Sequence, residues 1–159
     1  MSPRLAMLVA ALLIGGCGFH LQGRAPLPAA LAVTYVQATD HQSDFVQSLR
    51  KALLASGARL TGSGTEASAT VRITTDEVKR NILSVSARNT PREYEVVYTV
   101  RFSVSANGAE LLPEQEVSLT RDYSFDERTL LAKEHEEAIL REALARDLAD
   151  IVMRRLASL

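Results

Sequence analysis

The side chains with the clearest binding chemistry lie in one short segment between two strand-like stretches. Residues 84–92 carry two arginines, Arg88 and Arg92, together with the amide of Asn89. Guanidinium groups beside amide and hydroxyl groups can bind a phosphate or a carboxylate through forked, charge-assisted hydrogen bonds. An ordinary solvated hairpin end is the alternative interpretation. Lys133, at the beginning of the last expected helix, would add positive charge if folding brings the two segments together.

A second chemical feature is Cys17, the only cysteine of the chain. It follows a run of ten apolar residues from Leu5 to Ile14 and the pair Gly15-Gly16. The run is about half of the ~20 apolar residues that a membrane-spanning helix needs, so it predicts a signal peptide instead. An aliphatic residue and two small residues before a cysteine resemble the lipobox of bacterial lipoproteins.

The lipobox resemblance implies that residues 1–16 are removed and that Cys17 then carries an S-linked diacylglycerol and an N-linked acyl chain. Two or more acyl chains hold a protein firmly in a bilayer. Gly18 stands where an aspartate would favour retention at the inner membrane, so the resemblance implies the periplasmic side of the outer membrane. Residues 17–30 contain prolines and glycine and are expected to form a lipidated, extended arm.

Motifs of catalysis and of metal binding are missing from the sequence. One cysteine excludes multi-cysteine metal sites, and His20, His41 and His135 are far apart in the chain. No nucleophile elbow, zinc-protease helix or phosphate-binding glycine loop is present. We therefore expect no enzyme, no cofactor and no metal. A net charge of -1 on 159 residues argues against a nucleic-acid partner.

The expected elements form one α+β domain over residues 31–159. Residues 32–37 have strand-forming side chains, and a helix capped by Ser43 or Asp44 ends near Gly57. The small, polar segment 61–68 is expected to be a loop. A long, irregular strand over 69–85 and a strictly alternating strand over 93–105 follow.

The rest of the chain predicts a hairpin and a long helix. Asn107-Gly108 suits a tight turn before a strand that reaches about residue 125. Arg121 falls among the inward positions of that strand, so either the strand slips in register or the arginine emerges near an edge. Residues 129–156 form one helix. The prediction is a small, mostly antiparallel four-stranded sheet with two helices on one face, in the order β-α-β-β-β-α.

Three sets of residues resemble a known family. The opening heptad Cys-Gly-Phe-His-Leu-Gln-Gly at 17–23 looks like the start of the mature lipopolysaccharide-assembly lipoproteins of the LptE family. Arg88-Asn89 before Glu93-Tyr94, and the Leu-Ala-Lys triplet at 131–133, are similar to later parts of the family pattern. Thr90-Pro91 departs from it, because a glycine-containing turn is common there.

The resemblance implies a non-enzymatic subunit of the outer-membrane lipopolysaccharide translocon. Such a subunit would plug the lumen of an LptD-like assembly β-barrel, assist its assembly and bind lipopolysaccharide in transit. Arg88 and Lys133 match family positions for lipopolysaccharide contact, and Asn89 and Arg92 lie beside the first of them. The alternative is an anchored scaffold lipoprotein of another envelope complex that binds no lipid. An envelope hydrolase acting through His41 or His135 is a third, weaker alternative.

Overall fold

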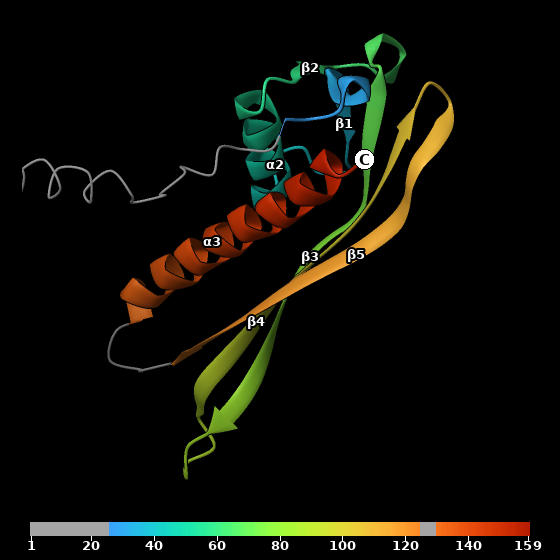
Figure 1. Ribbon diagram of the computed structural model, residues 1–159. Helices are drawn as coiled ribbons and strands as arrows, with labels where there is room; N and C mark the ends of the chain where they lie inside the picture. Colours follow the sequence, from blue (N-terminus) through green and yellow to red (C-terminus); the bar gives the residue numbers. More distant parts are fainter. Residues whose placement is uncertain (1–25, 125–129) are drawn as a thin grey trace, which may run out of the picture.

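Two helices lie on one side of a twisted five-stranded sheet (Figure 1). The computed structural model describes the backbone of residues 26–124 and 130–159 and the side chains of residues 26–124 and 137–159. The strand order is β2-β1-β3-β4-β5. Two neighbouring pairs of strands are parallel and the other two pairs are antiparallel, with β3 belonging to both kinds. The parallel strands are β1 (Val33–Gln37), β2 (Arg59–Thr61) and β3 (Ala69–Val85); β3 pairs antiparallel with β4 (Pro91–Ala106), and β4 with β5 (Ala109–Ser124).

The predicted α+β class with two helices is confirmed, but the prediction of four strands in the order β-α-β-β-β-α is wrong. The observed order is β-α-β-β-β-β-α. Strand β2 was missed because it has only three residues, and its backbone pairs with β1, more than twenty residues earlier. The segment expected to be a loop begins with the last residue of β2, Thr61, and contains a 3-10 turn at Gly64–Glu66. A second 3-10 turn at Ala29–Leu31 begins within the expected extended arm.

Helix α2 (Asp44–Ala55) connects β1 to β2 and begins and ends as its sequence predicts. The hydroxyl of Ser43 accepts a hydrogen bond from the Val46 amide at 3.1 Å, which caps the first turn. Gly57 ends the helix with a φ of +89°, a left-handed conformation that favours glycine. The five buried side chains follow helical spacing and face the sheet: Phe45, Val46, Leu49, Ala52 and Leu53.

Strands β4 and β5 form the hairpin that Asn107-Gly108 predicts. Both turn residues have positive φ, at 51° and 80°. The pairing is regular from Phe102 opposite Gln115 to Glu93 opposite Ser124, so β5 does not slip where Arg121 occurs. Strand β5 is an edge strand, and Arg121 reaches helix α3 (Leu130–Ala157), where it binds Asp147 at 2.8 Å. Of the two alternatives for Arg121, the structure therefore shows the one in which the arginine emerges at an edge of the sheet.

The core lies between the sheet and the two helices, near the end that carries β1 and β2. Helix α3 contributes an apolar stripe, and alternate residues of β4 face it. Within the described ranges, no helix combines the length and the apolar composition needed to span a bilayer. The largest fully buried side chains include one or more from each layer: Tyr98, Phe102, Phe45, Leu144, Leu148 and Leu156.

Strands β3 and β4 are longer than the core that they help to form. Figure 1 shows their hairpin continuing past the beginning of α3 to the lower end of the molecule. We call residues 77–97 the distal hairpin. Its register shifts at two places near the turn, between Ile82 and Ser84 and between Ser84 and Val85. Such irregularities increase local twist and redirect side chains at the end of a ribbon.

Candidate functional site

The end of the distal hairpin is a well-defined turn, which we call the hairpin tip (Ser86–Thr90). The Ser86 amide donates to the Thr90 carbonyl at 2.7 Å, and the Asn89 amide donates to the Ser86 carbonyl at 2.9 Å. Asn89 has a φ of 60°, in the left-handed region that asparagine tolerates better than most residues. The local sequence thus closes the turn without glycine.

The Ser86 hydroxyl organises the inside of the hairpin tip. It accepts hydrogen bonds from the backbone amides of Arg88 and Thr90, each at 3.2 Å, and its oxygen lies 2.5 Å from the Thr90 hydroxyl. The side chains of Arg88 and Asn89 are exposed, as is that of Arg92 on the returning strand. A turn that is fixed internally therefore presents both guanidinium groups to the exterior.

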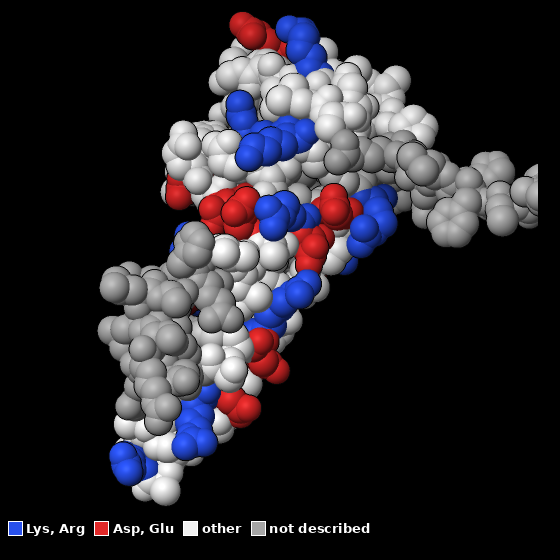
Figure 2. All heavy atoms as spheres, turned by 90° about the vertical axis from the view of Figure 1, so that its left-hand side faces the viewer, with Lys and Arg blue, Asp and Glu red and all other residues white. Residues whose placement is uncertain are grey.

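The two tip arginines differ electrostatically from five other arginines of the helices and strands, which form ion pairs. Neither Arg88 nor Arg92 forms an ion pair within the part of the chain that the structure describes. Figure 2 shows basic atoms at the lower end of the molecule, where the hairpin tip lies. Their donors are thus available to an anionic ligand. Five other arginines each bind a carboxylate: Arg80, Arg101, Arg121, Arg141 and Arg146.

The structure brings together three of the predicted binding residues. Arg88 and Asn89 lie in the hairpin tip, and Arg92 lies two residues after it, near the beginning of β4. Lys133 belongs to the first turn of α3, but its side chain is outside the described residues. Cys17 is also outside the described residues. Lipidation at Cys17 and a joint site of Arg88 with Lys133 therefore stay predictions.

A four-residue cluster near the beginning of α3 was missed by the sequence analysis. Glu137 accepts hydrogen bonds from Arg80 of β3 at 2.9 Å and from the Tyr123 hydroxyl of β5 at 3.0 Å. The Tyr123 ring stacks on Tyr94 with centroids 5.5 Å apart, and the Arg80 guanidinium lies 4.9 Å from the Tyr94 centroid. We call these residues the helix clamp, because they join α3 to three strands.

The helix clamp also has a distinct electrostatic environment. Burial, followed by the hydrogen bond to Glu137, raises the pKa of the Tyr123 hydroxyl.

The sequence contains one indication of the helix clamp. When the two predicted strands pair, their register places Tyr94 opposite Tyr123. Glu137 lies four residues after Lys133, so helical periodicity places both positions on one side of α3. The clamp therefore fixes α3 against the sheet at Glu137.

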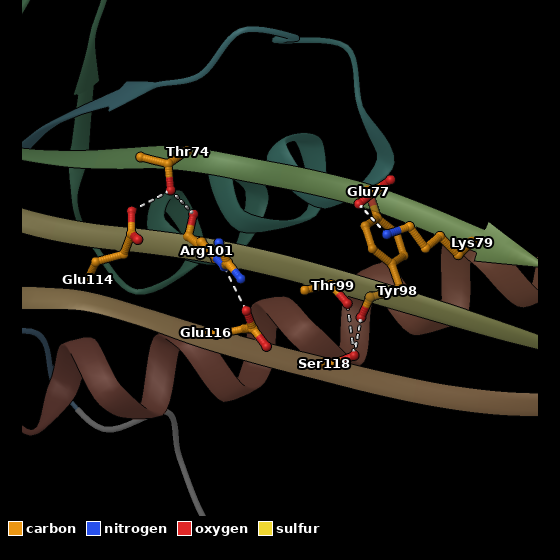
Figure 3. A network of polar contacts seen from close by, with 9 residues as sticks. All are labelled: Thr74, Glu77, Lys79, Tyr98, Thr99, Arg101, Glu114, Glu116 and Ser118. Carbon is orange, nitrogen blue, oxygen red and sulfur yellow. Dashed lines mark hydrogen bonds and ion pairs between the residues drawn. The ribbon is translucent and has the colours of Figure 1, made fainter.

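The face of β3, β4 and β5 that points away from the helices is polar. Figure 3 shows cross-strand contacts on it: Thr99 and Ser118 lie 3.0 Å apart, and Arg101 binds Glu116 at 2.6 Å. The hydrogen bond of Thr74 to Glu114 measures 2.7 Å. Cross-strand polar pairs of this kind suit a sheet face in contact with water or with a polar protein wall.

The described residues offer little support for the hydrolase alternative. His41 is exposed and lines an open hollow of about 390 Å³ whose walls include no carboxylate. A histidine base needs a partner to orient it and a nucleophile within reach. Among the described residues, no three potential metal ligands of the histidine, cysteine or carboxylate type lie close together. The side chain of His135 is outside the described residues.

The sequence profile of the LptE family, described as lipopolysaccharide-assembly, matches residues 30–156. This match covers most of the chain. The chain belongs to the LptE family. An LPS-assembly lipoprotein LptE of Pectobacterium atrosepticum is 25% identical over 156 residues, with 98% of this chain and 84% of the relative covered. One from Yersinia enterocolitica is 26% identical over 160 residues, covering 98% and 77%.

Two solved lipoprotein structures share the fold. An uncharacterized lipoprotein B of Nitrosomonas europaea, solved by NMR, has a TM-score of 0.72 at 27% identity, covering 89% of this chain and 91% of the other. The rare lipoprotein B of Shewanella oneidensis has a TM-score of 0.68 at 26% identity, covering 79% and 94%. The LptE match spans the hairpin tip, the helix clamp and α3. The predicted family and the role in lipopolysaccharide assembly are thus confirmed.

Proposed function

We propose that this LptE-family chain is a non-enzymatic subunit of the outer-membrane lipopolysaccharide translocon and binds lipopolysaccharide at its hairpin tip. The observation that carries the proposal is the pair of exposed arginines, Arg88 and Arg92, at the end of a hairpin that reaches beyond the core. Asn89 lies between them. In a chain of a lipopolysaccharide-assembly family, two guanidiniums without an ion pair in the described part of the chain are complementary to the phosphate groups of that lipid.

Lys133 would complete the site from the helix side. The helix clamp fixes α3 one turn after this residue, through Glu137. An ammonium group on the same side of the helix would then approach the ligand as a point charge, whereas the arginines bind in a forked geometry. This arrangement predicts that the lysine contributes affinity and the arginines contribute orientation.

The proposed partner is an LptD-like β-barrel, with this chain filling its lumen and assisting its assembly. Two features support this. The lumen of a large outer-membrane barrel is polar, and the outer face of β3, β4 and β5 presents cross-strand polar pairs such as Arg101 with Glu116. An acylated Cys17 would hold the domain at the periplasmic side of the outer membrane. Membership of a lipopolysaccharide-assembly family is consistent with that location.

Charge reversal at the site tests lipopolysaccharide binding. The full chain carrying Arg88→Glu and Lys133→Glu is compared with one carrying Arg50→Glu and Arg154→Glu, two arginines that form no ion pair in the described part. We expect at least a tenfold loss of affinity in the first variant only, because each charge-assisted contact is worth about 1.5–3 kcal/mol. Equal affinities would contradict the proposed site.

Co-purification tests the barrel partner and separates it from the scaffold alternative. The chain is isolated from detergent-solubilised outer membranes, and a large β-barrel is expected in equal amount. If another envelope protein is recovered instead, and lipopolysaccharide is not bound, the scaffold alternative is correct.

A separate variant, Cys17→Ala, tests the lipid anchor. It should leave the domain folded but release it from the membrane fraction. Continued recovery of a processed, membrane-bound form would contradict lipidation at this cysteine.

A further inference from the structure

The distal hairpin exposes large apolar side chains next to its basic tip. Val78, Ile82, Leu83 and Val85 are 37%, 57%, 49% and 52% exposed. We call these four residues the apolar strip. They make up half of the eight exposed large hydrophobic residues in the described part of the chain, yet they occupy only eight consecutive positions. Single exposed apolar residues are ordinary, but a cluster marks an interaction site.

The position of the apolar strip explains its exposure. Register places Ile82 opposite Tyr94 and Val78 opposite Tyr98, on the side of the sheet that faces the helices. Tyr98 is buried there, but β3 is exposed on both faces over most of the stretch from Glu77 to Val85. Val78 and Ile82 therefore lie on the helix-facing side of the sheet, and Leu83 and Val85 follow at the two register shifts before the hairpin tip.

We propose that the apolar strip binds the acyl chains of the lipid whose phosphate groups bind the hairpin tip. This inference rests on the proposed function and assigns a second, apolar subsite to it. The ligand class is an acylated, phosphorylated glycolipid, and one hairpin contacts both of its chemical parts. Arg88 and Arg92 bind the anionic head, and the strip shields part of the hydrocarbon from water.

Charge and size favour acyl chains over the other candidates. The strip adjoins two guanidiniums that form no ion pair among the described residues, so an amphiphilic anion matches both surfaces at once. A polar barrel lumen offers no counterpart for four apolar side chains. A second copy of this chain would need to bury ~800 Å² on each partner, far more than four partly exposed side chains supply.

The part of the strip that adjoins the hairpin tip is Ile82, Leu83 and Val85. Arg80, which binds Glu137 and lies over the Tyr94 ring, separates these three residues from Val78. An acyl chain whose head group binds the tip is therefore expected to contact Ile82, Leu83 and Val85.

Binding measurements with two ligands test the proposal. The full lipidated chain in phospholipid nanodiscs is titrated with lipopolysaccharide and with fully deacylated lipopolysaccharide that keeps its phosphates. The strip variant carries Ile82→Thr, Leu83→Thr and Val85→Thr, since threonine is compatible with a strand. The control carries Leu54→Thr, Leu111→Thr and Ile139→Thr, which are exposed apolar residues elsewhere. Equal thermal midpoints establish that all three proteins are folded.

The expected pattern separates the subsite from the proposed function. The strip variant should bind lipopolysaccharide about tenfold more weakly, because several buried methylene groups are lost, and should bind the deacylated form normally. The control should bind both ligands like the original chain. Unchanged lipopolysaccharide affinity in the strip variant, or equal losses for both ligands, overturns the acyl subsite. If the original chain binds neither ligand, the proposed function itself fails.

Photocrosslinking in living cells adds a second test that identifies the occupant. A benzoylphenylalanine at position 82 of the full chain should form an adduct with lipopolysaccharide, and the same residue at position 54 should not. Leu54 is a suitable control because its side chain is 56% exposed, close to the 57% of Ile82. An adduct with a barrel protein at position 82, or the absence of a lipid adduct there, overturns the proposal.

Discussion

The two halves of strand β3 contain similar residues but have different environments. Ala69, Val71 and Ile73 in the first half are buried against the helices, whereas Ile82 and Val85 in the second half are exposed. The same strand, paired with the same neighbour, therefore serves two purposes. The first half stabilises the domain, and the second half carries apolar surface that the fold does not need. Coverage by helices decides between these roles, and residue type does not.

The sharpest test of this comparison substitutes one residue type in both halves. Ile73→Ala should lower the free energy of unfolding by about 3 kcal/mol, because a 6% exposed side chain leaves a cavity. Ile82→Ala should change it by less than about 0.5 kcal/mol, as surface substitutions usually do. Urea denaturation of both variants measures the difference. Similar midpoints would show that the two halves contribute equally to stability.

A smaller effect is expected at the boundary between the two halves. The Tyr98 hydroxyl donates to Asp76 at 2.8 Å and accepts from the Phe45 amide at 3.2 Å, so it joins β4, β3 and the beginning of α2. Tyr98→Phe should cost about 2 kcal/mol, because the partners on both sides lose a bond in a largely buried site. The control is Tyr123→Phe, whose hydroxyl donates to Glu137 at a less buried position.

The titration of Tyr98 gives this prediction a pH dependence. Burial, followed by the hydrogen bond to Asp76, raises the pKa of its hydroxyl above that of an unfolded tyrosine. The stabilisation by the Tyr98 hydroxyl is therefore complete below about pH 10, the pKa of tyrosine in the unfolded chain. It declines as the pH rises further. Thermal melts between pH 8 and 11 should show a smaller alkaline loss in Tyr98→Phe than in the original chain.

The smallest effect concerns the helix clamp. Glu137→Gln keeps the size of the side chain but removes its charge, and the Glu137 side chain is 35% exposed, so the global cost should be below about 1 kcal/mol. Amide hydrogen exchange near residue 140 should accelerate, because the beginning of α3 loses an attachment. Glu142→Gln is the control, since its ion pair with Arg146 lies within the helix. Equal exchange in both variants would argue against a clamp.

Local patterns accounted for the elements that the sequence predicted well. Strict alternation defines β4, Asn107-Gly108 defines its turn, and an apolar stripe defines α3. The arginines of the hairpin tip were also visible, because they are close together in sequence. Features that depend on distant pairing were not visible. Strand β2 forms three residue pairs with β1, and the helix clamp joins Arg80 to Glu137, 57 residues later.

The paired or unpaired state of each arginine was equally hidden from the sequence. Arg80 and Arg88 are eight residues apart, yet the first binds a carboxylate of α3 and the second binds none in the described part of the chain. The exposure of Ile82 and Leu83 likewise depends on where the helices end relative to the sheet. Both properties are decided by tertiary packing, and both define the proposed lipid site.

The position of β5 at the border of the sheet has a consequence for solubility. A sixteen-residue border strand leaves a row of backbone donors and acceptors to which a neighbouring molecule could add a strand. Pro113 has no amide hydrogen to offer, and the carboxylates of Glu110 and Glu114 add negative charge that would repel the same strand of an approaching copy. These substituents therefore resist uncontrolled polymerisation of the chain through β5.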